Sequence, residues 1–283
     1  MAGVHLLAIP YPAQGHVIPL MELSQCLAER GCRVTFVNTE FDHRRVVNTL
    51  ADDKLSGGRI RLVSIPDGMK PEDNRNDLGR LCQAILRVMP GKLRGIIEEI
   101  NQKDEDNKIT CMIADLNMAW ALEVAKGMGI PGVAFWPAAA AILVCGISIP
   151  KMIGDGVISE DGTPLKDEMI ELGPNMPVIR PEHLVWRCIG DFETQQIVID
   201  YMLKNAKIIE DVEWQVCNTS IILEPGALAN YPRLLPIGPL IAHHRHGKRA
   251  LELKEKVVHG VRQGGDSYNN FNNLVDWLTS AQT

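Results

Sequence analysis

The stretch HLLAIPYPAQGHVIPLMELSQCLAERG, residues 5–31, decides the fold class of this chain. It begins with a continuous apolar run, passes through a proline-rich turn, and continues with leucines at the spacing of one helix face. A buried strand that leads directly into an amphipathic helix is the building unit of parallel α/β sheets. In the turn, His16 stands where a nucleotide-binding loop would place its third glycine.

The same alternation of short apolar runs and helical patterns continues along the chain. Strands are predicted at 4–9, 33–38, 60–65, 109–114, 132–136, 214–218 and 234–236. Helices are predicted at 44–50, 77–102, 120–128, 138–147 and 193–207, with Pro90 kinking or dividing the second. We therefore predict a Rossmann-like, mostly parallel, doubly wound sheet with helices on both faces. Residues 150–185 are rich in Gly and Pro, and we expect irregular surface loops over a cleft there.

The pattern divides the chain into three parts. Residues 1–240 form the main domain, 241–248 a short linker, and 249–283 a tail of two polar helices. The first tail helix is predicted at about 248–263, and the second opens at Asp266 or Ser267, both good N-cap residues. Its apolar side chains form a narrow stripe: Phe271, Leu274, Val275 and Leu278. A stripe of this width predicts that the tail docks on the main body.

Composition excludes several classes of protein. A net charge of −6 gives no electrostatic footprint for nucleic acid or an anionic membrane. The seven cysteines are scattered without any CxxC pair, which argues against a disulfide framework or structural zinc and favours a reducing compartment. Residues 130–150 are uncharged, but Pro131 and Pro137 divide them into a strand and a helix. We expect a cytoplasmic protein without a metal site, in which the histidines at 243–246 lie in an exposed linker.

His16 and Asp115 each follow a predicted strand. Ligands of open parallel sheets bind beyond the carboxyl ends of the strands, and adjacent strands one and four would bring these side chains together. Such a pair can act as a general base with its orienting carboxylate. The alternative is a helix-capping histidine and an aspartate that caps the next helix. The sequence contains neither GxGxxG at this turn, nor GxxxxGK[ST], nor GxSxG, so dinucleotide, P-loop and nucleophile-elbow sites are unsupported.

Large apolar side chains flank the same edge and are candidates for a binding pocket. They are Met89, Met118, Trp120, Phe135, Trp136 and Ile142, with Gly15 and Pro137 in the adjoining turns. One interpretation is the wall of an apolar pocket for a flat hydrophobic ligand. The other is that these methionines and aromatics belong to the core.

Three segments resemble the N-terminal half of plant UDP-sugar-dependent glycosyltransferases that act on small molecules. They are residues 5–40, which include the PxxGHxxP turn, residues 113–141 (IADLNMAWALEVAKGMGIPGVAFWPAAAA), and the motifs VCNTS, LEPGAL and LLPIGPL within 216–240. The resemblance implies a GT-B architecture, whose first domain holds the acceptor and whose second holds the donor. It also implies that His16 deprotonates an acceptor hydroxyl, that Asp115 pairs with it, and that the oxygen attacks a UDP-sugar with inversion.

The resemblance also implies roles for the pocket candidates. The acceptor would contact Gly15, Met89, Met118, Trp136, Pro137 and Ile142. Some members of the family carry a hydroxyl residue near the sugar where this chain has Pro137, which weakens any donor contact from this half. UDP-sugar would be a co-substrate, with no tightly bound cofactor.

One departure from the family is large. The donor-binding signature, including HCGWNS, is absent, and residues 249–278 resemble the last two helices of the family. We interpret the chain as a glycosyltransferase whose donor domain is excised between Leu240 and Arg249, by design rather than by natural splicing. The expected function is acceptor binding with little or no transfer, restored by a donor domain in trans. The alternative is a non-catalytic binding module or scaffold that self-associates through its exposed face.

Overall fold

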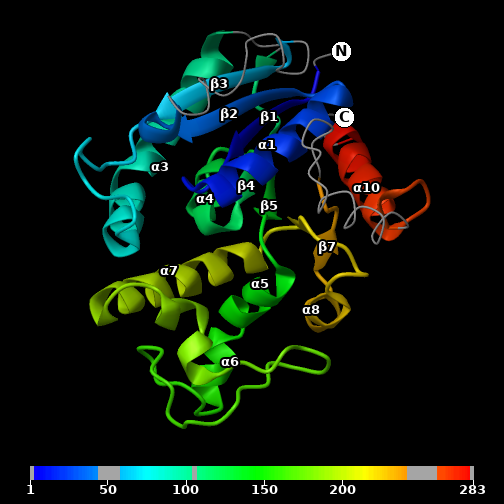
Figure 1. Cartoon of the computed structure of the whole chain (residues 1–283). Coiled ribbons are helices and arrows are strands. Elements are labelled where there is room, and N and C mark those ends of the chain that lie inside the picture. Colours follow the sequence, from blue (N-terminus) through cyan, green and yellow to red (C-terminus); the bar gives the residue numbers. More distant parts are fainter. Residues whose placement is uncertain (1–2, 44–57, 104–106, 241–259, 281–283) are drawn as a thin grey trace.

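The computed structural model describes residues 3–43, 58–103, 107–240 and 260–280 (Figure 1). The strands are β1 (His5–Ile9), β2 (Arg33–Thr39), β3 (Ile60–Ile65), β4 (Cys111–Asp115), β5 (Gly132–Trp136), β6 (Trp214–Cys217) and β7 (Leu234–Pro236). The helices are α1 (Gln14–Glu29), α3 (Leu78–Lys103), α4 (Trp120–Lys126), α5 (Ala140–Ile147), α6 (Ile149–Gly154), α7 (Phe192–Glu210), α8 (Pro225–Asn230) and α10 (Asp266–Ser280). Short 3-10 turns cover Leu116–Met118, Pro181–His183 and Val185–Cys188.

The seven strands form one parallel sheet in the order β3-β2-β1-β4-β5-β6-β7. The chain builds outward from β1 to β3 and then crosses to β4, so β1 and β4 are neighbours at the point where the direction reverses. Leu7 and Ile9 of β1 enter one core cluster, while Leu6 and Ala8 enter the other. The predicted doubly wound sheet is confirmed.

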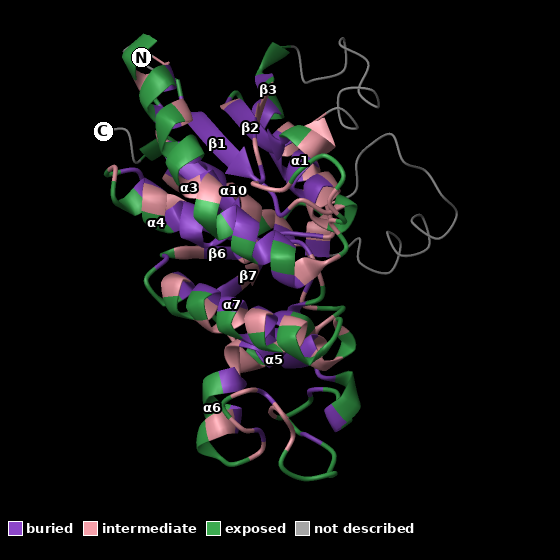
Figure 2. Ribbon diagram, turned by 90° about the vertical axis from the view of Figure 1, so that its left-hand side faces the viewer, coloured by how far each residue is buried: buried purple, intermediate pink, exposed green. Residues whose placement is uncertain are grey.

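Helices cover both faces of the sheet, whose first strands are buried along their length (Figure 2). On one face, α3 contributes a stripe at helical spacing: Leu81, Ile85, Met89, Leu93 and Ile97. On the other face, α1 packs on β1 and β2 and α10 packs on β7, and both bury leucines in the second core cluster. α3 runs from Leu78 to Lys103 with Pro90 inside it, so of the two predicted effects of this proline, a kink or a division, the division is wrong. Pro90 removes the hydrogen bond to the carbonyl of Leu86, a residue on the exposed side, where water can replace it.

The helix α10 packs on the main body. Leu274, Val275 and Leu278 are buried in the same cluster as β1, and Phe271 lies under the guanidinium of Arg30, 5.4 Å from the ring centroid. Asn270 Nδ2 donates to the carbonyl of Pro236 at 3.0 Å. The helices predicted at 44–50 and 248–263 fall wholly or mostly outside the described residues, as does the linker 241–248.

Residues 150–185 are mostly irregular, as predicted, but their position differs from the prediction. α6 and two short antiparallel bridges organise them, and they pack against α5 and α7 on the side away from the sheet (Figure 1). Trp186 is fully buried in this third cluster and donates to the carbonyl of Gly162 at 2.8 Å. The scattered apolar residues therefore form a core of their own with the two helices.

No helix in the described part of the chain is both long enough and apolar enough to cross a membrane.

Candidate active site

His16 and Asp115 meet at the carboxyl ends of β1 and β4. His16 is the third residue of α1, and Asp115 is the last residue of β4. The register pairs Ile9 with Ala114, which brings the two strand ends level with one another. The Nδ1 atom of His16 lies 2.7 Å from Oδ2 of Asp115, so the predicted pair is a hydrogen bond.

The surroundings of Asp115 fix the orientation of the imidazole. Its side chain is 0% exposed, and its other oxygen, Oδ1, accepts from the backbone N–H of Asn117 at 2.9 Å. An ionised carboxylate can only accept, so Nδ1 of His16 carries the proton and neutral Nε2 presents a lone pair. Nε2 has no hydrogen-bond partner within the described residues, and the histidine side chain is 20% exposed. This arrangement can accept a proton from a ligand.

Two aromatic rings flank the imidazole. The ring centroid of Tyr11 lies 5.3 Å from that of His16, and that of Trp136 lies 6.5 Å away, both in edge contacts. Trp136 is held by its own indole N–H, which donates to the carbonyl of Ala139 at 2.8 Å. Burial, followed by the neighbouring Cys82, raises the pKa of Tyr11 and keeps its hydroxyl protonated. Sequence reasoning missed Tyr11, although an aromatic residue two positions after a strand was a visible signal.

The pocket candidates separate into two groups. Trp136 and Ile142 line a small cavity beside Asn117, and Ile142 is 40% exposed. A Cβ added at Gly15 would meet no atom within 4 Å, so the turn leaves free space before His16. Pro137 is buried directly after β5. No residue of 150–185 lines this cavity, so the predicted cover is wrong; that segment packs beyond α5 and α7 instead.

Met89 and Met118 belong to the apolar core. They are 1% and 0% exposed and pack in the cluster between the sheet and α3. Their position is therefore the one expected if these methionines belong to the core. Contact of either methionine with a ligand stays a prediction.

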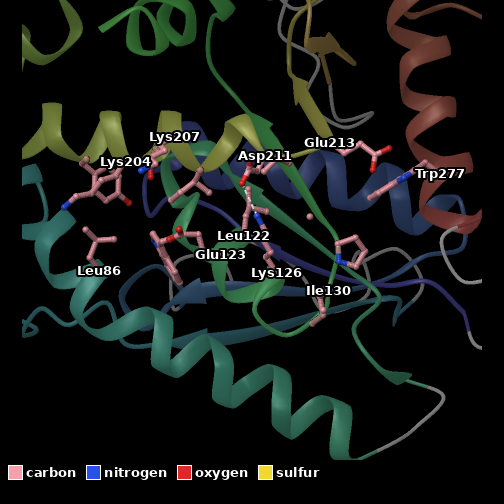
Figure 3. Close-up of a pocket in the computed structure, with 18 residues that line it drawn as sticks. Leu86, Leu122, Glu123, Lys126, Ile130, Lys204, Lys207, Asp211, Glu213 and Trp277 are labelled. Atoms are coloured by element: carbon pink, nitrogen blue, oxygen red, sulfur yellow. Dashed lines mark hydrogen bonds and ion pairs between the residues drawn. The ribbon is translucent and has the colours of Figure 1, made fainter. Parts of the chain in front are cut away.

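A larger cavity lies elsewhere. It has a volume of about 750 Å³ and lies between α4 and α7, near the amino ends of β5 and β6 (Figure 3). Lys126 and Asp211 form an ion pair across it at 3.0 Å, and Trp277 lies at one end. Neither His16 nor Asp115 lines it, and Trp120 is the one predicted pocket residue among its lining residues. Its size alone does not make it the site, because it does not include the His16–Asp115 pair.

The described residues contain no group of three or more His, Cys, Asp or Glu side chains that could hold a metal ion. The histidines at 243–246 lie outside the described residues. All seven cysteines are free.

No family model matches the sequence. Its relatives include UDP-glycosyltransferase 83A1 from Arabidopsis thaliana, which is 38% identical over 98% of this chain and 59% of its own length. (R)-mandelonitrile beta-glucosyltransferase from Prunus dulcis is 28% identical over 83% of this chain and 51% of its own length. This chain therefore spans between half and three-fifths of the curated relatives it matches.

Solved structures show the same fold. A UDP-glucosyltransferase from Polygonum tinctorium, in complex with 3,4-dichloroaniline, has a TM-score of 0.67 at 22% identity, covering 89% of this chain and 55% of that one. Phytolacca americana UGT2, with UDP-2-fluoro-glucose and pterostilbene, has a TM-score of 0.65 at 20% identity, covering 90% of this chain and 57% of that one.

The alignment with the Arabidopsis relative also bears on the tail. An excised internal domain would appear as a gap of domain length, yet 288 aligned residues take up 98% of this chain and leave room for only a few unmatched positions. The alignment thus gives no support to excision between Leu240 and Arg249. The homologues of this chain are plant UDP-glycosyltransferases, and its sheet has the Rossmann-like fold of the GT-B structures.

Proposed function

We propose that this chain supplies the acceptor-binding, general-base part of an inverting UDP-sugar-dependent glycosyltransferase that acts on small hydrophobic or phenolic acceptors. The observation that carries the proposal is the hydrogen bond from His16 Nδ1 to the buried carboxylate of Asp115, with Nε2 left open. Homology to a UDP-glycosyltransferase and to glucosyltransferases named for (R)-mandelonitrile and 7-deoxyloganetin supports the same assignment.

The proposed chemistry moves one proton and exchanges one bond. The acceptor hydroxyl lies against Nε2 of His16 and gives up its proton, and Asp115 stabilises the imidazolium that forms. The acceptor oxygen forms a bond to the anomeric carbon of the sugar from the face opposite UDP. The bond between that carbon and the diphosphate oxygen breaks, and UDP departs with the electron pair. Trp136 and Ile142 provide an apolar surface for the acceptor ring.

The residues that bind the UDP-sugar lie outside this chain in this proposal. Without a bound and oriented electrophile, the base loses the proximity contribution, which is on the order of 7–11 kcal/mol. We therefore expect acceptor binding but little or no transfer by the chain alone. Exposed apolar residues follow β5 and β6, namely Ile142, Ile222 and Leu223. They offer a surface on which a donor-binding part could dock, or through which two copies could associate.

Complementation tests the proposal. The chain is mixed with a separately produced donor-binding part of a relative such as the Arabidopsis protein, and UDP release is measured with a phenolic acceptor. We expect the mixture to transfer sugar. His16→Ala should lower the rate by about 10²–10⁴-fold, the usual contribution of a general base. His183→Ala, at an exposed position in a 3-10 turn, is the matched control and should leave the rate unchanged.

Other outcomes decide against the proposal. Transfer by the chain alone would contradict the placement of the donor site elsewhere. If the mixture binds acceptor, as measured by calorimetry, but transfers no sugar, the alternative of a non-catalytic binding module gains support. Full activity in His16→Ala would remove the histidine from the mechanism.

A further inference from the structure

Tyr201 of α7 reaches the turn that carries Asp115. Its hydroxyl donates to the backbone carbonyl of Asn117, 84 positions away in the sequence. The residue is 6% exposed, and a buried phenol needs an acceptor. Burial raises the pKa of Tyr201 well above its ordinary value, so the hydroxyl remains a donor.

Two further hydrogen bonds continue from Asn117 to the imidazole. The N–H of Asn117 donates to Oδ1 of Asp115 at 2.9 Å, and Oδ2 of Asp115 accepts from Nδ1 of His16 at 2.7 Å. Asn117 takes part only through its backbone. Three consecutive hydrogen bonds therefore connect α7 to the candidate base, through the 3-10 turn Leu116–Met118.

We propose that Tyr201 is a positioning residue for His16. By holding the carbonyl of Asn117, it fixes the turn so that the amide of Asn117 and the carboxylate of Asp115 stay aligned. The carboxylate then keeps the imidazole proton on Nδ1 and leaves the lone pair on Nε2. The catalytic consequence rests on the proposed function, but the effect on the imidazole can be measured in this chain alone.

A purely structural role for Tyr201 makes a different prediction. If the ring merely fills space between α7 and the sheet, phenylalanine serves equally well, because it has the same shape without the hydroxyl. Tyr201→Phe therefore separates positioning from packing. It removes one hydrogen bond and leaves the carbonyl of Asn117 without its donor.

The experiment measures the tautomer of His16 in the whole chain. At pH 8.5, where an ordinary imidazole is neutral, ¹⁵N spectra distinguish a protonated ring nitrogen from one with a lone pair, and His16→Ala identifies the signals. We expect the Nδ1–H form in the unaltered chain and averaged signals from both tautomers in Tyr201→Phe. The amide of Asn117 should exchange with solvent about tenfold faster in this variant, which corresponds to the loss of one hydrogen bond.

Two controls make the result specific. Tyr231→Phe removes another tyrosine hydroxyl, which donates to Oε1 of Gln215 at a distance of 2.7 Å. Because this hydrogen bond lies away from the site, the variant should leave the His16 signals unchanged. Asn117→Ala keeps the backbone groups that the proposal uses, so it too should leave them unchanged. Unchanged His16 signals in Tyr201→Phe would overturn the proposal, as would equal shifts in either control.

The outcome is separable from that of the proposed function. In the complementation assay, Tyr201→Phe should lower kcat without raising KM for the acceptor. If the tautomer shifts but the transfer rate does not, Tyr201 positions His16 and the role of His16 as base is wrong. If the tautomer does not shift, the positioning role is wrong whatever the assay gives.

Discussion

At the residue scale, one buried carboxylate organises the candidate site. Asp115 is fully covered, and a buried charge is tolerated only where donors surround it. It receives a donor on each oxygen, from His16 and from the amide of Asn117. The sequence predicts the first of these contacts, because both residues follow strands that a doubly wound sheet makes neighbours. It cannot predict the contact of Tyr201 with the carbonyl of Asn117, which depends on how side chains from separate elements pack.

A second histidine, His5, makes stability depend on pH. It is 5% exposed, its Nδ1 donates to the carbonyl of Asn107 at 2.7 Å, and its Nε2 lies 2.9 Å from Oγ1 of Thr35. Burial, and then the charges of Arg33 and Arg61, lower its pKa below 6.5 against the opposing effect of the Asn107 bond. Below pH 6.5 the unfolded chain takes up a proton that the folded chain does not, so the free energy of unfolding falls as the pH falls.

The expected result is a loss of stability between pH 7.5 and pH 5.5 that is smaller in His5→Gln. Urea unfolding at pH 7.5 and pH 5.5 measures the free energy of unfolding. The difference between the two pH values in each histidine variant is compared with that of the parent chain. The contribution is fully present above the unfolded pKa and is lost as the pH falls toward the folded one. His183→Gln, at an exposed position, is the control. An equal pH dependence in His5→Gln and the parent chain would contradict the assignment.

At the element scale, the bounds of a helix or strand agree with the sequence prediction where neighbouring residues alone determine the element. The strands 60–65, 132–136 and 234–236 have the predicted bounds, because each is a short apolar run between turn residues. The irregular character of residues 150–185 was predicted, but their position was not, because their apolar residues have no period. Those residues become a core only where α5 and α7 meet them, and that encounter has no local signature.

Gly162 is the tightest position in this segment. Its φ is +76°, and an added Cβ would lie 1.7 Å from Cδ1 of Ile199 and 2.7 Å from Nε1 of Trp186. We expect Gly162→Ala to destabilise the fold by about 2–4 kcal/mol, from backbone strain and overpacking together. Gly156 has a φ of +66° but no atom within 4 Å of its added Cβ, so Gly156→Ala should cost only about 1–2 kcal/mol. Urea unfolding measures the loss of unfolding free energy in both variants. Equal losses would contradict the overpacking, because they would show that Ile199 and Trp186 move aside without cost.

At the scale of the whole molecule, the docked tail decides how many folding units the chain has. α10 packs on β7 and buries its leucines in the second core cluster, and the ring centroid of its Trp277 lies 5.6 Å from that of Trp214 at the start of β6. A helix of fifteen residues with one narrow apolar stripe is marginal by itself in water. Its stability therefore comes from the sheet, although the sequence division treats 249–283 as a separate part.

We therefore expect α10 and the sheet to unfold as one cooperative unit. Leu278 is 2% exposed, and Leu278→Ala should destabilise the whole chain by about 2–5 kcal/mol, because a buried leucine leaves a cavity when truncated. Tryptophan fluorescence, to which Trp214 and Trp277 contribute, and far-UV circular dichroism should give coincident urea transitions that shift together. Asn273→Ala, on the exposed side of the same helix, should shift neither. A fluorescence transition at lower urea concentration than the dichroism transition would instead show that the tail unfolds as a separate unit. The parallel sheet would then stay folded after α10 has detached from it.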